Sequence, residues 1–148
     1  MMDICARQGH SFEVERIAKA RISRLSALGP ERDADRAVTQ DNLANLYLQQ
    51  RRNDEAISLL INSLAIFERT SGPSARAMSV CCLYLSRAYL RRQDFERAEF
   101  YGRRALESAK ASEGAESEAA AITADELAVA VAFNATHAKS AQKAAEAL

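Results

Sequence analysis

The amino-acid sequence predicts an all-α fold in which helix hairpins stack one after another into a solenoid. The first observation is that the chain resembles itself after a shift of 42 positions, so that Leu85 falls on Leu43 and Tyr89 falls on Tyr47. A fixed period of this size is typical of repeat proteins built from stacked helix hairpins. The second observation is that the 148 residues include only five Gly and two Pro, the residues that interrupt helices. We therefore expect one helical domain over residues 1–148, with about three to four hairpins.

The start of the chain, residues 1–28, is predicted to be an incomplete repeat. Apolar residues recur there at helical spacing, which predicts a helix over residues 12–27. Ile22 falls on Leu64 after one such shift, so this helix corresponds to the second helix of a hairpin. In the same register Gly9 marks a turn, and the residues before it are expected to be the last turns of a mostly missing first helix.

Two complete repeats are predicted next, over residues 33–71 and 75–112. A Gly-Pro pair precedes each of them, which suits the end of one helix and the start of the next. Each repeat is expected to hold two helices joined by a short polar turn. The first of these four helices is expected at about residues 33–50. The second runs from the turn at residues 51–54 to about residue 70, and the third and fourth cover about residues 75–92 and 95–111.

A degenerate repeat is predicted at residues 117–148. A first helix is expected from about residue 118 to 133, and a final Ala-rich helix from about residue 137 to 147. Leu127 falls one period after Leu85, which keeps the register, but Val131 stands where the earlier repeats have Tyr.

The residues that carry the period resemble the tetratricopeptide repeat. The resemblance covers mainly residues 37–110, and its period of 42 is longer than the usual 34. It is similar in this respect to the long-helix variant found in kinesin light chains. The resemblance implies a right-handed superhelix and a role in binding proteins. The residues that carry it are Leu43, Ala44, Tyr47, Ala56 and Leu64 in one repeat, and Leu85, Ser86, Tyr89, Ala98, Ala105 and Leu106 in the next.

Small residues at matching positions are expected to form the core where the helices cross. Ala44 and Ala56 in one repeat, and Ser86 and Ala98 in the next, would let two backbones come close together. The tyrosines beside them would fill the remaining space and keep a hydroxyl group near the polar turn. Gly102 lies inside a predicted helix, where it costs about 1 kcal/mol relative to Ala, and close approach of a neighbouring helix would explain it.

A binding groove is predicted along the first helices of successive hairpins. The matching positions combine amide side chains, which both donate and accept hydrogen bonds, with two arginines four residues apart. The opposing interpretation is an ordinary solvated face, and Asp41 and Glu126 argue against a purely basic groove. The predicted partner-binding residues are Asn42, Asn45 and Gln49 in one repeat, and Tyr84, Arg87 and Arg91 in the next.

Other function classes receive little support from the sequence. Lys plus Arg equals Asp plus Glu, so no overall charge draws the chain to nucleic acid or to a membrane, and no apolar run approaches the length of a membrane span. The odd count of three cysteines favours reduced thiols in a cytoplasmic protein, with Cys82 in the core and Cys81 more exposed. We find no nucleophile or phosphate-loop motif and no metal-ligand spacing, with His10 and His137 far apart. We therefore expect no catalytic residue, no metal and no cofactor.

Two functional hypotheses remain. The first is an adaptor or scaffold that binds an unidentified peptide or protein in the groove. The second is a structural subunit that self-associates or docks through its end helices, which carry apolar residues without an evident partner. Those residues are Phe12, Ile17 and Ile22 near the start, and Ala124, Leu127, Ala128, Val131, Ala141, Ala144 and Ala145 near the end.

Overall fold

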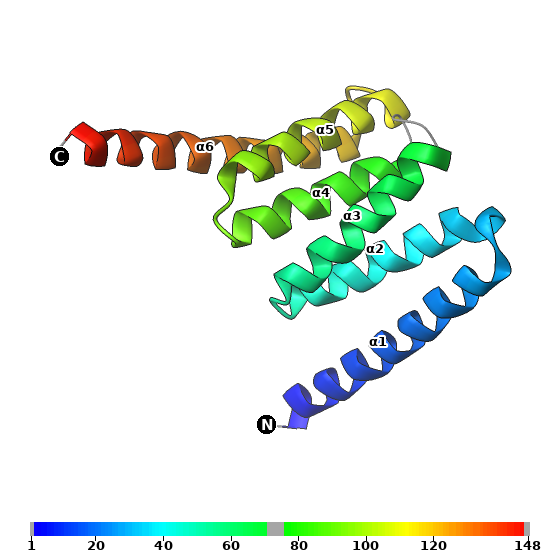
Figure 1. Ribbon diagram of the computed structural model, residues 1–148. Helices are drawn as coiled ribbons and strands as arrows, with labels where there is room; N and C mark the ends of the chain where they lie inside the picture. The colour runs from blue at the N-terminus through cyan, green and yellow to red at the C-terminus, as the bar shows by residue number, and fades with distance from the viewer. Residues whose placement is uncertain (1, 71–75, 147–148) are drawn as a thin grey trace.

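The protein is a stack of antiparallel α-helices, described by a computed structural model over residues 2–70 and 76–146 (Figure 1). The described residues form helices and connecting turns, with no strand among them. In chain order the helices are α1 (Met2–Leu28), a short 3-10 helix η1 (Pro30–Arg32), α2 (Asp33–Gln49), α3 (Asn53–Thr70), α4 (Arg76–Arg91), α5 (Phe95–Glu113) and α6 (Glu118–Glu146). The all-α repeat fold predicted from the sequence is confirmed.

The two central hairpins, α2–α3 and α4–α5, agree with the predicted helices to within a few residues. Each hairpin turn contains a non-glycine residue with positive φ, Arg51 at 62° and Gln93 at 61°. These two residues are 42 positions apart, so the period extends to the backbone conformation of the turns. The predicted Gly-Pro turn at residues 71–74 lies outside the described residues.

The helices cross closely at the small residues. Ala44, Ala56, Ser86 and Ala98 are all completely buried. The Ser86 hydroxyl donates a hydrogen bond of 2.7 Å to the carbonyl oxygen of Ala98 on the facing helix. A side chain can reach the facing backbone in this way only where the two helices lie very near each other. The predicted core role of these residues is confirmed.

Both predicted end hairpins are wrong, because α1 and α6 are each one continuous helix. Gly9 does not end α1, and no turn separates residues 133 and 137. The positions that match the positive-φ turn residues are Gly9 and Ala135. An Ala is strained at positive φ, and an Ala-rich sequence such as the end of α6 favours an uninterrupted helix. A single Gly costs a helix about 1 kcal/mol, which does not by itself stop it.

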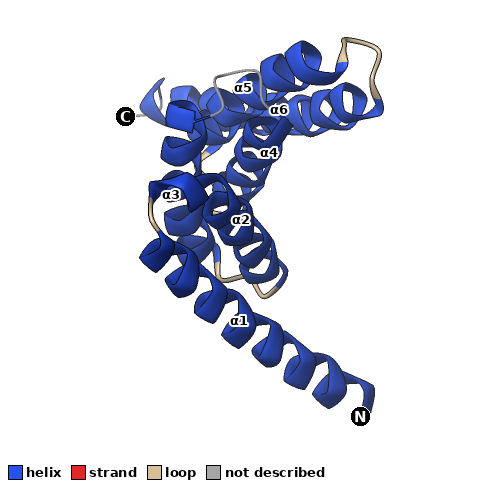
Figure 2. Cartoon of the chain, turned by 90° about the vertical axis from the view of Figure 1, so that its right-hand side faces the viewer, coloured by secondary structure: helices blue, strands red, loops and turns tan. Residues whose placement is uncertain are grey.

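The long end helices extend beyond the compact middle of the stack. Figure 1 shows the red end of α6 projecting past α4 and α5, and Figure 2 shows α1 diverging from α2 toward the N-terminus. The described side chains from Ala135 to Lys143 are all exposed. The ends of the stack therefore offer helical surface that the middle does not.

Gly102 marks a second close approach, between α5 and α6. A β-carbon built on Gly102 would lie 3.1 Å from Leu127 Cδ1 and 3.2 Å from Ser86 Oγ, which is tighter than ordinary contact. The predicted reason for this glycine, a neighbouring helix close by, is confirmed.

We predict that Gly102→Val lowers the free energy of unfolding by about 2 kcal/mol, because the added methyl groups force Leu127 and the Ser86 hydroxyl aside. Urea unfolding followed by circular dichroism measures the change. Ala111→Val, at an exposed position of the same helix, is the matched control. Equal unfolding midpoints for the two variants would show that the space around Gly102 is not limiting.

Candidate functional site

The predicted groove residues lie on α2 and α4, the first helices of the two complete hairpins. α4 contacts both α2 and α6, so the three first helices lie side by side and form one inner face of the stack. The second helices, α3 and α5, pack behind them as their hairpin partners. The six predicted residues fall into two groups that differ in their hydrogen bonds.

The first group consists of the three amide side chains on α2. Asn42 and Gln49 are exposed and Asn45 is half-buried. Within the described part of the chain, none of the three side chains has a hydrogen-bond partner. Because they are spaced three and four residues apart, they follow one side of the helix on successive turns. They present a row of donors and acceptors to solvent.

The arginines on α4 are already engaged. Arg87 Nε donates to Glu126 Oε1 of α6 at 2.8 Å, and a second guanidinium nitrogen donates to the same oxygen. This hydrogen bond with Glu126 raises the pKa of Arg87. The Arg87 guanidinium lies 5.9 Å from the ring centre of Tyr84. Arg91 donates to the carbonyl oxygen of Leu48 near the end of α2. The expectation that Glu126 offsets positive charge of the predicted groove is therefore confirmed for Arg87.

A polar hollow lies at one end of the inner face, beside the α2–α3 turn. It has a volume of about 470 Å³ and is lined by Gln49, Arg51, Asn53 and Arg91. Asn53 Oδ1 is buried and has no hydrogen-bond partner among the described residues. A buried acceptor without a partner costs roughly 1–3 kcal/mol, so the position of Asn53 is unfavourable by about this amount.

Asp41 does not face the groove, and the prediction that it blunts the groove charge is wrong. Its side chain is buried, only 5% exposed, and Oδ1 has no hydrogen-bond partner among the described residues. Burial raises the pKa of this carboxyl group to about 7, while contacts with Ser63 and Cys81 partly oppose the rise. Asp41 belongs to the core between α2, α3 and α4, and its effect is on stability.

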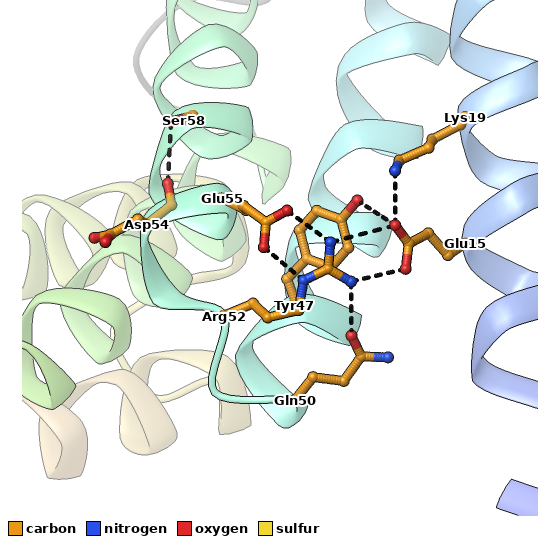
Figure 3. Close-up of polar contacts among 8 residues, drawn as sticks. All are labelled: Glu15, Lys19, Tyr47, Gln50, Arg52, Asp54, Glu55 and Ser58. Carbon is orange, nitrogen blue, oxygen red and sulfur yellow. Dashed lines mark hydrogen bonds and ion pairs between the residues drawn. The ribbon is translucent and has the colours of Figure 1, made fainter. Parts of the chain in front are cut away.

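A polar cluster at the α2–α3 turn holds α1 in place (Figure 3). Glu15 of α1 lies at its centre and accepts hydrogen bonds from the Tyr47 hydroxyl at 2.9 Å and from Arg52 Nη1 at 2.8 Å. Lys19 Nζ lies 2.7 Å from the same carboxylate. The hydrogen bond from Arg52, followed by those from Lys19 and Tyr47, lowers the pKa of Glu15 to about 2.

Arg52 connects this cluster to α3. Its Nε lies 2.5 Å from Glu55 Oε2, and its guanidinium carbon lies 3.9 Å above the Tyr47 ring. The predicted placement of the Tyr47 hydroxyl near the polar turn is confirmed. Glu15 itself was not singled out in the sequence, because its partners Tyr47 and Arg52 are far away along the chain and no local spacing indicates them.

The described cysteines do not form a reactive site. Cys81 and Cys82 are both free thiols and completely buried, so the prediction that Cys81 is more exposed is wrong. Burial raises the pKa of the Cys82 thiol to about 12 and shifts that of Cys81 upward as well. Both thiols therefore stay protonated and unreactive at neutral pH. Among the described residues, no group of three His, Cys, Asp or Glu side chains could hold a metal ion.

One stretch of α6, Glu118–Lys143, is long and apolar enough to cross a membrane, judged by length and composition alone. The expectation that no apolar run reaches this length is therefore wrong for α6. Within the stack, however, the same stretch is tied to the fold by polar contacts, since Glu126 binds Arg87 and Asn134 donates to Glu99 at 2.7 Å. These contacts are those of a packed repeat helix.

Comparison with known families agrees with the geometry. A family model described as tetratricopeptide repeat matches residues 35–111, slightly more than half of the chain, and the matched region spans the hairpins α2–α3 and α4–α5. The chain belongs to the tetratricopeptide repeat family. A search of curated proteins found no match.

We predict that Glu15→Gln loosens α1 from the stack, because the neutral amide loses the charge-assisted bonds to Arg52 and Lys19. Hydrogen exchange should become about fivefold faster in the second half of α1, with α4 unchanged. Glu13→Gln on the exposed side of α1 is the matched control. Unchanged protection of α1 would mean that apolar packing alone holds this helix.

We predict that Asp41 makes the protein less stable as the pH rises. Folding raises the pKa of this carboxyl from 3.8 to about 7, so the native state keeps a proton that the unfolded chain releases. Its contribution is fully present below pH 4 and is lost as the pH rises through 7, by about 4 kcal/mol in total, of which about 2.5 kcal/mol is lost between pH 5 and pH 8. Urea unfolding at pH 5 and pH 8 should show this loss in wild type and in the control Glu107→Gln, but not in Asp41→Asn. A loss of equal size in Asp41→Asn would assign the pH dependence to other groups.

Proposed function

We propose that this chain is a non-catalytic adaptor that binds an extended segment of a protein partner along the inner face of α2 and α4. Tetratricopeptide repeats generally mediate protein–protein interaction, and this coarse function follows from the family. The finer proposal depends mainly on one observation, the row of three unpartnered amides at Asn42, Asn45 and Gln49.

The chemistry of the row suits a peptide backbone. Each amide side chain offers a donor and an acceptor, as each peptide unit does, so a segment laid along α2 could exchange hydrogen bonds without a fixed sequence. The hollow beyond Gln49, which Asn53 also lines, continues the row of amides toward the α2–α3 turn. Since Glu126 already neutralises Arg87, we propose recognition through the backbone and not through a ligand carboxylate.

Three further features complete the proposal. The repeat is the long variant with a period of 42, supported by the positive-φ residues Arg51 and Gln93, which are separated by this period. The protein is cytoplasmic, supported by two buried free thiols. It acts without a cofactor and without binding nucleic acid or membrane, supported by its zero net charge.

The alternative proposal is a structural subunit that docks through its end helices. It is supported by apolar side chains that remain exposed there, 71% for Phe12, 56% for Ile17 and 53% for Phe133. Ile22, in contrast, is partly buried against the core. The two proposals concern different surfaces, so one protein can use both.

We predict that the triple variant Asn42→Ala/Asn45→Ala/Gln49→Ala loses peptide binding and keeps its fold. Peptides selected from a random displayed library on wild-type protein would be synthesised and titrated calorimetrically. The triple variant should bind at least tenfold more weakly, because three amides that pair with the ligand backbone are gone. Asn62→Ala, which removes an exposed amide on α3, is the control and should bind as wild type does. Equal binding by the triple variant would exclude the α2 row as the site.

A further inference from the structure

We propose that a second copy of this chain packs its α1 against the outer face of α6, so that the two end helices together form one more hairpin of the stack. This head-to-tail contact concerns surfaces other than the groove. It is argued from the repeat register, from exposure and from charge.

The α6 face is the surface that a first helix normally turns toward its hairpin partner. In α2 that surface includes Ala37 and Ala44, which are both completely buried against α3. Two periods later, the matching positions in α6 are Ala121 and Ala128, and both are exposed. Because these side chains are small, another helix could approach α6 as closely as α3 approaches α2.

The α1 face is the matching surface of a second helix. Ala56 in α3 and Ala98 in α5 are completely buried against their first helices, whereas the corresponding residue of α1, Val14, is 47% exposed. Further along α1, Arg21 and Arg24 are also exposed. They line a shallow hollow of about 460 Å³ together with Arg16, Ile17 and Ala20.

The hydrogen bonds inside the hairpins show which residues face each other. Ser63 Oγ donates to the carbonyl oxygen of Ala37 at 3.1 Å, which places these two positions opposite. Ala121 lies two periods after Ala37, and Arg21 lies one period before Ser63. The same pairing would therefore place Ala121 of one copy opposite Arg21 of the other. The bond from Ser79 to the carbonyl oxygen of Ala105 gives the same pair, because Ser79 is one period before Ala121 and Ala105 is two periods after Arg21.

The same register brings opposite charges together. In this register Glu118 of α6 would lie opposite Arg24 of the second copy. Asp125 of α6 would lie one helical turn from Ala121, the residue that faces Arg21 of the second copy. Within the described part of the chain none of these four side chains has an ion-pair partner. Both complete hairpins have an ion pair at the corresponding end, Asp33 with Arg69 and Arg76 with Glu113.

This complementarity is why a second copy is the occupant that we propose. Within the described residues, the face of α6 that no second helix covers carries small and acidic residues, and the face of α1 that no first helix covers carries apolar and basic ones. The contact is heterologous, so it would repeat along a chain of copies or close into a ring. It would also extend the inner face of first helices from one copy into the next.

Sedimentation velocity over a range of protein concentrations tests the proposal. Wild type should show a mass that grows with concentration to at least twice that of the monomer, less so in high salt because the ion pairs are screened. Arg21→Glu/Arg24→Glu and Glu118→Arg/Asp125→Arg should each remain monomeric with unchanged helicity, since all four side chains are exposed. Lys110→Glu, an exposed charge reversal on α5, is the control and should associate as wild type does.

Mixing the variants identifies the geometry. The α1 variant keeps an intact α6 face and the α6 variant keeps an intact α1 face, so their mixture should stop at a dimer with one copy of each. A wild type that stays monomeric at every concentration would overturn the proposal. It would also be overturned if the α1 variant associates as wild type does, because the contact would then join two α6 helices.

Discussion

The fold depends on the very close crossing of the two helices within each hairpin. Ala44 and Ala56 are completely buried at one crossing, and Ser86 and Ala98 at the other, where a serine hydroxyl bonds the facing backbone at 2.7 Å. A helix pair separated by larger side chains would lie farther apart and would turn its faces at a different angle. The alignment of α2, α4 and α6 into one inner face, and hence the row of amides, follows from repeating this crossing.

The sequence predicted the middle of the molecule well because this crossing has a local signature. Small residues a fixed distance apart, with a tyrosine between them, recur after 42 positions, and the helices follow from them. The ends were mispredicted because the same register was extended to positions where the turn cannot form. Arg51 and Gln93 adopt positive φ within turns fixed by the hairpins around them. Ala135 has no such surroundings, so the intrinsic preference of an Ala-rich sequence prevails and α6 continues.

For the candidate site, the sequence indicates which side chains share a face of one helix but not which partners they have. Helical register predicts that Asn45 and Arg87 occupy matching positions of their helices, because register depends on neighbouring residues. Their state depends on distant ones, since Arg87 is bound by Glu126, 39 residues later. The burial of Asp41 and the central role of Glu15 are likewise consequences of contacts between separate helices. One sequence without its relatives gives no sign of such pairs, so the charge of the groove had to come from the structure.

The distribution of charges then separates the two surfaces of this protein. On the face formed by α2, α4 and α6, Arg87 is bound by Glu126 and Arg91 by a backbone carbonyl oxygen, and the amides of α2 are the groups without a hydrogen-bond partner among the described residues. On the end helices, Arg21 and Arg24 of α1 and Glu118 and Asp125 of α6 have no ion-pair partner among the described residues, and exposed apolar side chains lie near them. Exposed ion pairs contribute little to stability, but complementary charges set the register and orientation of an association that apolar contact drives. This difference is why we propose the amides of α2 for an extended ligand and the charged end helices for a contact between copies.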